Sequence, residues 1–268
     1  MRLRNHLLLA AFVVLIGSLA IAQNSSSTAN PFHWKGTLNA GQMLTIKNIN
    51  GDIRAEGTPG NQVEITATKS GEGADQVRIE VVQSSEGIGV CAIYPDSDST
   101  CTVDPNWSTH SHGNNNHDRA RVEFTVHVPQ NVKLMARNIN GGVEAKNLGE
   151  VADATSVNGS VEVSTTHWAH LSSVNGSVTG HFGKADWSDK LNISTVNGNI
   201  TLALPADAST DVEFQSVNGR LKTDLPLTIQ SSSGEFGPKH MRGTIGGGGR
   251  SLKLNTVNGS VNLEKNSM

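Results

Sequence analysis

The residues with the clearest potential for chemistry lie in one short polar segment. His110 and His112 alternate there, and His117 and Asp118 follow closely. Imidazole and carboxylate groups are common protein ligands of Zn²⁺ and Cu²⁺, so these four residues form a candidate metal site. The segment is also rich in Asn and Gly, and no neighbouring sequence would fix its shape. A solvated loop is therefore the alternative interpretation.

Two further groups of residues suggest binding. Asp96, Asp98 and Asp104 resemble the start of a calcium loop, but the Gly and the distal Glu of an EF-hand are missing. A disulfide-bounded solvent loop is the interpretation that we favour for them. Trp168 and Trp187 lie in polar connections between repeats, where exposed rings would offer a platform for sugars. Filling gaps in the core is the alternative role for both rings.

The sequence contains no recognisable catalytic constellation. Solenoid enzymes that cleave polysaccharides need clustered carboxylates, whereas the outward positions after the recurrent Asn-Gly pairs are mostly uncharged. The Ser and His residues match no nucleophile motif, and the glycine run 246–249 matches no phosphate-binding loop. We therefore expect no enzymatic activity and no cofactor. The outward positions in question are Ser160, Ser177, Asn199, Arg220 and Ser260.

The N-terminus predicts export. Arg2 and Arg4 precede an apolar stretch from Leu7 to Ala22, which ends in the small-x-small pattern of a cleavage site. Residues 1–22 are thus predicted to be a signal peptide, with an uncleaved anchor as the alternative. No later stretch is apolar enough to span a membrane, so the mature chain is predicted to be periplasmic, extracellular or at the cell surface.

The two cysteines agree with export. Cys91 and Cys101 are the only cysteines, and a lone pair in an exported protein predicts a disulfide. The ring that it closes has little apolar content of its own. By loop-closure entropy such a bond contributes roughly 2–3 kcal/mol.

Composition limits the fold class and the partners. The chain has 28 Gly and only 4% aromatic residues, which suits thin β layers with many tight turns. Removing a segment that contains Arg2 and Arg4 lowers the 21 basic residues to 19, against 24 acidic ones, so the mature net charge is −5 with His neutral. The charges are scattered, and nucleic acid is not an expected partner.

A repeat of the form Ser/Thr-Val-Asn-Gly-x-Val dominates the sequence. An aliphatic residue precedes each Asn, and another follows two residues after each Gly. From Asn140 onward the intervals are 18, 17, 22, 21 and 40 residues, and a degenerate copy at Ser231–Gly234 divides the longest one. The predicted turns are Asn50-Gly51, Asn140-Gly141, Asn158-Gly159, Asn175-Gly176, Asn197-Gly198, Asn218-Gly219 and Asn258-Gly259.

Two all-β architectures explain this repeat. As single motifs the Asn-Gly pairs predict hairpins, which would form an antiparallel β-sandwich. At nearly constant spacing they predict the corners of a single-stranded β-solenoid-like repeat fold, which we favour. Equivalent asparagines would then stack about 4.8 Å apart and form an amide ladder. Gly would supply left-handed backbone at each corner, and the last coil, near Val261, would be exposed.

The region before the regular repeats has a different pattern. Its four alternating segments are spaced like an antiparallel meander, which we interpret as the wider, capped start of the same sheets. The expected organisation is a signal peptide at 1–22, an N-terminal β region at 23–136 and an Asn-Gly repeat region at 137–268. The four segments are Val63–Ala67, Val77–Val81, Ile88–Ile93 and Arg121–Val128.

Together these motifs resemble a known bacterial family. Cys91–Pro95, the strand Val122–Pro129 and the Asn-Gly units match the family of proposed adhesins with β-strand repeats, also called the toastrack-type domain. The resemblance covers roughly Leu44 to Leu263. It implies a β-solenoid-like fold in the envelope or outside the cell, and it brings no known reaction and no catalytic residues.

The resulting functional hypothesis is a role without a reaction. We expect a non-catalytic exported protein that presents a β surface for adhesion or scaffolding, with a surface glycan or an envelope protein as partner. A periplasmic sensory or accessory domain that binds a membrane partner is one alternative. Metal binding through the His110–His117 loop is the other.

Overall fold

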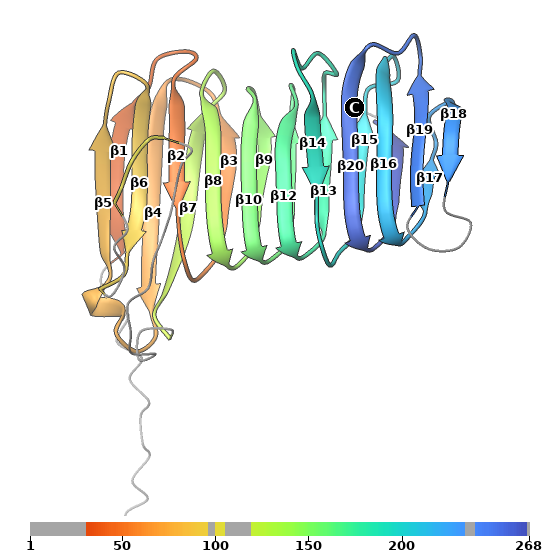
Figure 1. Ribbon diagram of the computed structural model, residues 1–268. Coiled ribbons are helices and arrows are strands. Elements are labelled where there is room, and N and C mark those ends of the chain that lie inside the picture. The colour runs from red at the N-terminus through yellow and green to blue at the C-terminus, as the bar shows by residue number, and fades with distance from the viewer. Residues whose placement is uncertain (1–30, 96–99, 105–118, 234–238, 267–268) are drawn as a thin grey trace, which may run out of the picture.

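Alternation of apolar and polar side chains gives each repeat two short strands with one buried face. The computed structural model describes residues 31–95, 100–104, 119–233 and 239–266, where the strands form two facing sheets (Figure 1). Sheet A contains, in spatial order, β1 (Phe32–Thr37), β4 (Gln62–Ser70), β7 (Arg121–Pro129), β3 (Ile53–Thr58), β9 (Val143–Leu148), β11 (Val161–Thr165), β13 (Val178–Phe182), β15 (Ile200–Leu204), β21 (Val261–Lys265) and β17 (Leu221–Thr223).

The second layer is longer by one strand. Sheet B contains, in spatial order, β18 (Leu227–Ser233), β19 (Lys239–Ile245), β16 (Thr210–Asn218), β20 (Arg250–Asn258), β14 (Leu191–Ser194), β12 (Ala169–Asn175), β10 (Ala152–Asn158), β8 (Lys133–Asn140), β2 (Met43–Lys47), β6 (Gly87–Ile93) and β5 (Arg78–Gln83). A short 3-10 helix, η1 (Ala74–Gln76), precedes β5.

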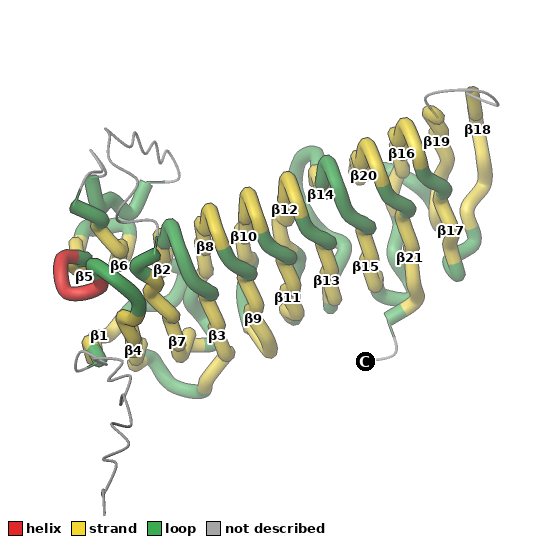
Figure 2. Tube along the Cα trace, turned by 90° about the horizontal axis from the view of Figure 1, so that it is seen from below, coloured by secondary structure: helices red, strands yellow, loops and turns green. Residues whose placement is uncertain are grey.

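Each repeat is one coil of a β-solenoid. The chain runs along a strand of sheet B, turns at Asn-Gly and continues along a strand of sheet A (Figure 2). Neighbouring coils pair in parallel, as β10 does with β8 and β12. The solenoid prediction is confirmed. The sandwich of hairpins is wrong, because the two strands joined by each Asn-Gly turn lie in different sheets.

The aliphatic residue after each corner enters the space between the sheets. Val161, Val178 and Ile200 occupy equivalent positions in successive coils and are fully buried. Burying such a side chain contributes on the order of 1.5–3 kcal/mol. One continuous apolar core runs between the sheets through both the N-terminal strands and the repeats.

The Ser or Thr of the motif also points inward, and its hydroxyl donates a hydrogen bond to a backbone carbonyl of the neighbouring coil. Ser156 Oγ donates to the carbonyl of Gly141, Ser173 Oγ to that of Gly159, and Thr195 Oγ1 to that of Gly176, each at 2.8 Å. A carbonyl that is turned inward at a corner needs such a donor, because an unpaired buried polar group is costly. This contact explains why the position carries a hydroxyl.

The asparagines form the expected ladder along the corners. Beyond Asn50, each side-chain amide donates to the Oδ1 of the asparagine in the preceding coil of the stack, at 2.8–2.9 Å. Since every interior asparagine donates once and accepts once, the side-chain type is fixed in each coil. In spatial order the ladder contains Asn50, Asn140, Asn158, Asn175, Asn197, Asn258 and Asn218.

The corner glycines serve mostly a different purpose from the expected one. Left-handed backbone occurs at Gly51, with φ 110°, and at Gly141, with φ 153°. At the other five corners the prediction is wrong, and the constraint is close approach between coils. A Cβ on Gly198 would lie 2.1 Å from the carbonyl oxygen of Gly176. The five corners are Gly159, Gly176, Gly198, Gly219 and Gly259.

The order of the coils in space differs from their order in sequence. The last coil, β20 and β21, lies between the β14–β15 coil and the β16–β17 coil (Figure 2). Val261 is consequently fully buried, so the expected exposed last coil is wrong. Ser231–Ser233, the described part of the degenerate copy, also form no coil, because β18 pairs antiparallel with β19 at the end of sheet B.

The N-terminal strands widen both sheets, but they form no meander. β4 pairs antiparallel with β1 and β7 in sheet A, whereas β5 pairs antiparallel with β6 in sheet B. The first coil, β2 and β3, joins the regular stack through parallel pairing with β8 and β9. Antiparallel strands thus close this end of the solenoid.

The close approach at Gly198 predicts the effect of a single methyl group. Gly198→Ala should lower the free energy of unfolding by about 1–3 kcal/mol, because the coils must move apart to admit the Cβ. Gly142→Ala is the matched control, since a Cβ there would be 3.3 Å from its nearest neighbour, the Ser160 carbonyl. Urea denaturation of both variants measures the difference. Equal stability of the two would contradict this account of the corner.

Candidate functional site

Several predicted site residues cannot be placed. His110, His112, His117 and Asp118 lie outside the described residues, as does the predicted signal peptide. Within residues 31–95, 100–104, 119–233 and 239–266, no group of three or more His, Cys, Asp or Glu side chains could hold a metal ion. No helix in these ranges is long and apolar enough to cross a membrane.

The disulfide is present and fixes a cover over one end of sheet B. Cys91 of β6 is bonded to Cys101. The segment that follows lies on the outer face of β2, where Thr45 Oγ1 donates to the carbonyl of Val103 at 2.9 Å. Lys47 is enclosed beneath it and donates to Thr102 Oγ1 at 2.7 Å. The outer face of sheet B is therefore covered at its N-terminal end.

Burial has an electrostatic consequence for Lys47. Removal from water lowers the pKa of its ammonium, and the charge of Arg137 acts in the same direction, while Asp104 opposes both. The carbonyl of Asp104 also accepts a hydrogen bond from the Lys47 ammonium at 3.1 Å. These contacts show that Lys47 anchors the covering segment and is not available to a ligand.

The two tryptophans do not form a sugar platform. Trp187 is buried in the core at 1% exposure, and its indole N–H donates to the carbonyl of Ser251. Its proposed ligand role is wrong, because a poorly aromatic core uses this large ring to fill volume. Trp168 is half-buried against the core and packs edge-on against His170, with ring centroids 5.4 Å apart. The two rings share no common exposed face.

The exposed apolar surface lies elsewhere, on the residue that precedes the corner asparagine in five of the seven repeats. This valine row continues from coil to coil along sheet B, with almost constant exposure of 37–41%. Among the described residues, Ile229 is the one other large apolar side chain that is exposed. The row contains Val157, Val174, Val196, Val257 and Val217 in spatial order.

A polar row runs beside the valine row, two residues earlier in each strand. Parallel register places each of its members next to the equivalent residue of the adjacent coil, about 4.8 Å away. Their hydroxyl and amide groups can both donate and accept hydrogen bonds. This hydroxyl/amide row contains Thr155, Ser172, Ser194, Asn255 and Gln215.

Four of the five members of each row, all except Val157 and Thr155, line a groove of about 590 Å³ on the outer face between β12 and β16. Its volume is within the ordinary range for ligand sites. Lys253, Lys239 and His240 lie at its C-terminal end, and no carboxylate is among the described residues that line it. At the opposite end of the face, Arg137 is held by two 2.6 Å hydrogen bonds to the Asp153 carboxylate. The groove is thus amphipathic along its length and basic at one end.

Glu213 lies beside the basic end and is surrounded by cations. Its carboxylate is 3.2 Å from His240 Nε2 and 3.6 Å from both Lys190 Nζ and Arg242. Burial alone would raise its pKa, but the hydrogen bond to His240 and the charges of Lys253, Lys190 and Arg242 outweigh burial, and the pKa of Glu213 is lowered. The carboxylate therefore stays ionised at neutral pH and cannot supply a proton there.

Sequence reasoning missed this surface although its signal was present. The position before each Asn in the Asn-Gly repeats is always aliphatic. In a strand that alternates inward and outward, the inward Ser or Thr forces the following valine outward. Had the Ser or Thr been recognised as an inward residue, strand alternation would have placed the valine row on the outer face.

Comparison with known proteins identifies related sequences and structures. A sequence model of the Toastrack DUF4097 family matches residues 41–264. No curated protein matches the chain. A solved structure of a proposed cell adhesion protein from Clostridium sporogenes is similar, with 13% identity and a TM-score of 0.42, over 88% of this chain and 100% of that one.

Two further solved structures show weaker similarity. A proposed adhesin from Bacteroides fragilis has 11% identity and a TM-score of 0.34, with 88% of this chain and 97% of that chain covered. A proposed adhesin from Parabacteroides merdae has 11% identity and a TM-score of 0.26, with 88% and 96% covered.

Proposed function

The chain belongs to the Toastrack DUF4097 family, and we propose that it is a non-catalytic, exported binding scaffold that holds an extended envelope polysaccharide along the outer face of sheet B. The single observation that carries this proposal is the groove formed by the valine row and the hydroxyl/amide row. Large exposed apolar patches with polar rims commonly mark interaction sites.

The geometry of the rows favours a polymer over a small compact ligand. The valine row advances by about 4.8 Å per coil, so its five members span about 19 Å in a straight line. A sugar chain presents apolar C–H faces and hydroxyl edges in alternation. The former suit the valines, and the latter suit groups such as Ser194 and Asn255, which donate and accept hydrogen bonds.

The chemistry of the groove favours binding without turnover. Glycoside hydrolysis needs two carboxyl groups on opposite sides of the scissile bond. In the part of the chain that the structure describes, the groove lining includes Lys239, His240 and Lys253 but no carboxylate, and the nearby Glu213 is held ionised by its cationic neighbours. A groove with these side chains can orient a sugar chain but supplies no acid and base pair to cleave it.

A charge in the valine row tests the proposed site. Val196→Asp should weaken binding of the mature chain to a soluble envelope polysaccharide at least tenfold, because a carboxylate replaces an apolar contact at 39% exposure. Calorimetric titration against a panel of neutral and acidic bacterial polysaccharides measures the affinity. A tenfold change corresponds to about 1.4 kcal/mol.

Thr179→Asp is the matched control, since Thr179 lies on β13 in sheet A, away from the groove. It should bind like the unaltered chain, and both variants should melt at similar temperatures. Failure of the unaltered chain to bind any polysaccharide of the panel would refute the proposed function. Equal binding by Val196→Asp would place the site elsewhere.

Export is supported by the basic and apolar N-terminal pattern and by the Cys91–Cys101 disulfide, a bond that persists in oxidising compartments. When the full chain is expressed in a bacterium, N-terminal sequencing of the protein from the envelope or medium should read Gln23 first. Recovery of a chain that begins at Met1 in the cytoplasm would contradict export.

A further inference from the structure

The C-terminal end of the solenoid is incomplete on one side. Sheet A ends at β17, whereas sheet B continues beyond the opposing β16 with β19 and β18. The inner face of these two strands consequently has no strand of sheet A opposite it. Ile229 of β18 is 56% exposed, and Leu227 and Met241 are only half-buried.

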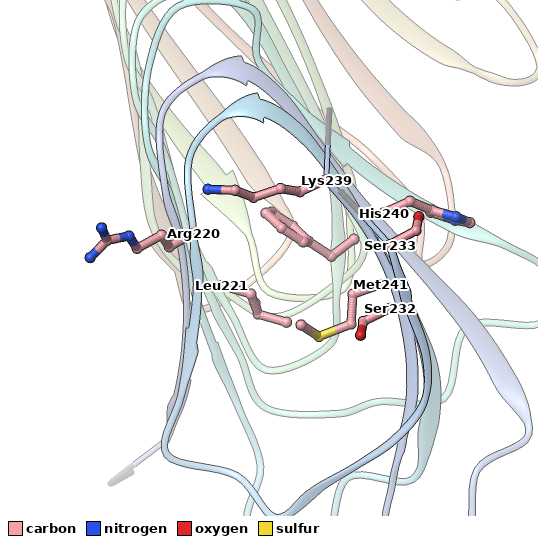
Figure 3. Close-up of a pocket in the computed structure, with 8 residues that line it drawn as sticks. Arg220, Leu221, Ser232, Ser233, Lys239, His240 and Met241 are labelled. Atoms are coloured by element: carbon pink, nitrogen blue, oxygen red, sulfur yellow. The ribbon is translucent and has the colours of Figure 1, made fainter. Parts of the chain in front are cut away.

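A cavity of about 670 Å³ occupies this open end (Figure 3). Its apolar lining comes from Phe214, Leu221 and Met241, which belong to β16, β17 and β19 respectively. Phe214 is buried at 1% exposure and forms the bottom of the cavity. The half-buried side chains of Leu221 and Met241 border its opening. The cavity is therefore the continuation of the core that a further strand of sheet A would cover.

The backbone of β17 offers an edge on which such a strand can form. The carbonyl of Arg220 accepts from the N–H of Val261, and the N–H of Asp224 donates to the carbonyl of Leu263. Because successive residues of a strand direct their backbone groups to alternate sides, Leu221 and Thr223 direct theirs away from β21. Since β17 is the last strand of sheet A, these groups lie at an open edge.

The positive charges around the opening of the cavity favour an acidic partner. Arg220 and Lys239 line the cavity, and none of the described residues that line it carries a carboxylate. The Lys239 ammonium is held at the rim by a 2.7 Å hydrogen bond to the carbonyl of Gly219. Lys222 projects outward from β17 itself, where it can pair with an acidic residue directly opposite on an added strand.

We propose that this end of the molecule binds an extended acidic segment of a partner protein, which adds to β17 as a new strand of sheet A. Apolar side chains of the segment cover Met241 and Ile229, and alternating Asp or Glu side chains meet Arg220 and Lys222. Strand addition of this kind takes affinity from backbone hydrogen bonds and specificity from alternate side chains. This site adjoins the polysaccharide groove, since Lys239 and His240 line both, but it lies at the open end of the core.

A second copy of the chain is a poorer occupant than an acidic segment. The strand that a second copy would offer at the N-terminal edge of sheet A is β1, whose outward residues include His33 and Lys35. Lys35 is already paired with Glu64 at 2.6 Å. A strand that carries basic outward side chains would be repelled by Arg220 and Lys222.

A synthetic peptide tests the proposal directly. A fluorescein-labelled nine-residue peptide of alternating Glu and Val should bind the mature chain in an anisotropy titration, whereas its Lys and Val counterpart should not. Methylation of the peptide nitrogens along one edge should abolish binding, because strand addition needs those N–H groups. Equal binding of the methylated peptide, equal binding of the two charge types, or no binding of the acidic peptide would overturn the proposal.

Variants locate the peptide on the cavity. Arg220→Glu and Ile229→Asp should each weaken binding of the acidic peptide at least tenfold, and both side chains are exposed enough for the fold to tolerate the change. Val157→Asp is the matched control at 37% exposure, on the distant part of sheet B, and should bind normally. Loss of binding in the control alone would place the peptide in the valine row. Analytical ultracentrifugation tests self-association of the chain. If the chain self-associates and Ile229→Asp abolishes this, the open end of the solenoid binds a second copy and the proposal is overturned.

Discussion

The close contact between neighbouring Asn-Gly corners is the constraint on which the rest of this structure depends. Three groups meet there in every regular coil. An asparagine amide bonds to the next asparagine, and a glycine faces the carbonyl of the adjacent glycine. A Ser or Thr hydroxyl donates a hydrogen bond to that carbonyl. Because these contacts fix the register of each coil, core residues such as Val178 and outward residues such as Val174 align with their equivalents. The core and the binding surface are both consequences of the corner.

The sequence predicted those features that depend on recurrence. Asn-Gly pairs that recur every 17–22 residues between Asn140 and Asn218 were enough to predict a solenoid and the amide ladder. Recurrence also shows that glycine is needed, but not whether the reason is its own φ or the neighbouring coil, so the explanation for Gly198 was wrong. For Trp187 the sequence left a ligand role and a core role open, and the folded chain confirms the core role, with a hydrogen bond from the indole N–H to the carbonyl of Ser251.

The order of the coils was beyond sequence reasoning. The 40-residue interval before Asn258 is compatible with two coils in succession, and all coils carry the same motif, so neither length nor pattern distinguishes one neighbour from another. The structure places Asn258 between Asn197 and Asn218. As a result the chain ends inside the stack, and the β18–β19 pair becomes the end of sheet B. The open cavity at that end follows directly from this arrangement.

The order of coils is also the claim that a single measurement tests most directly. Hydrogen–deuterium exchange followed by mass spectrometry reports how often each segment opens, and interior strands open least. If the last coil lies inside the stack, amides of β20 and β21 should exchange as slowly as those of β10 and β11, and β17 and β18 should exchange much faster. If residues 250–265 exchange as fast as β17 and β18, the last coil is an end coil and the account is contradicted.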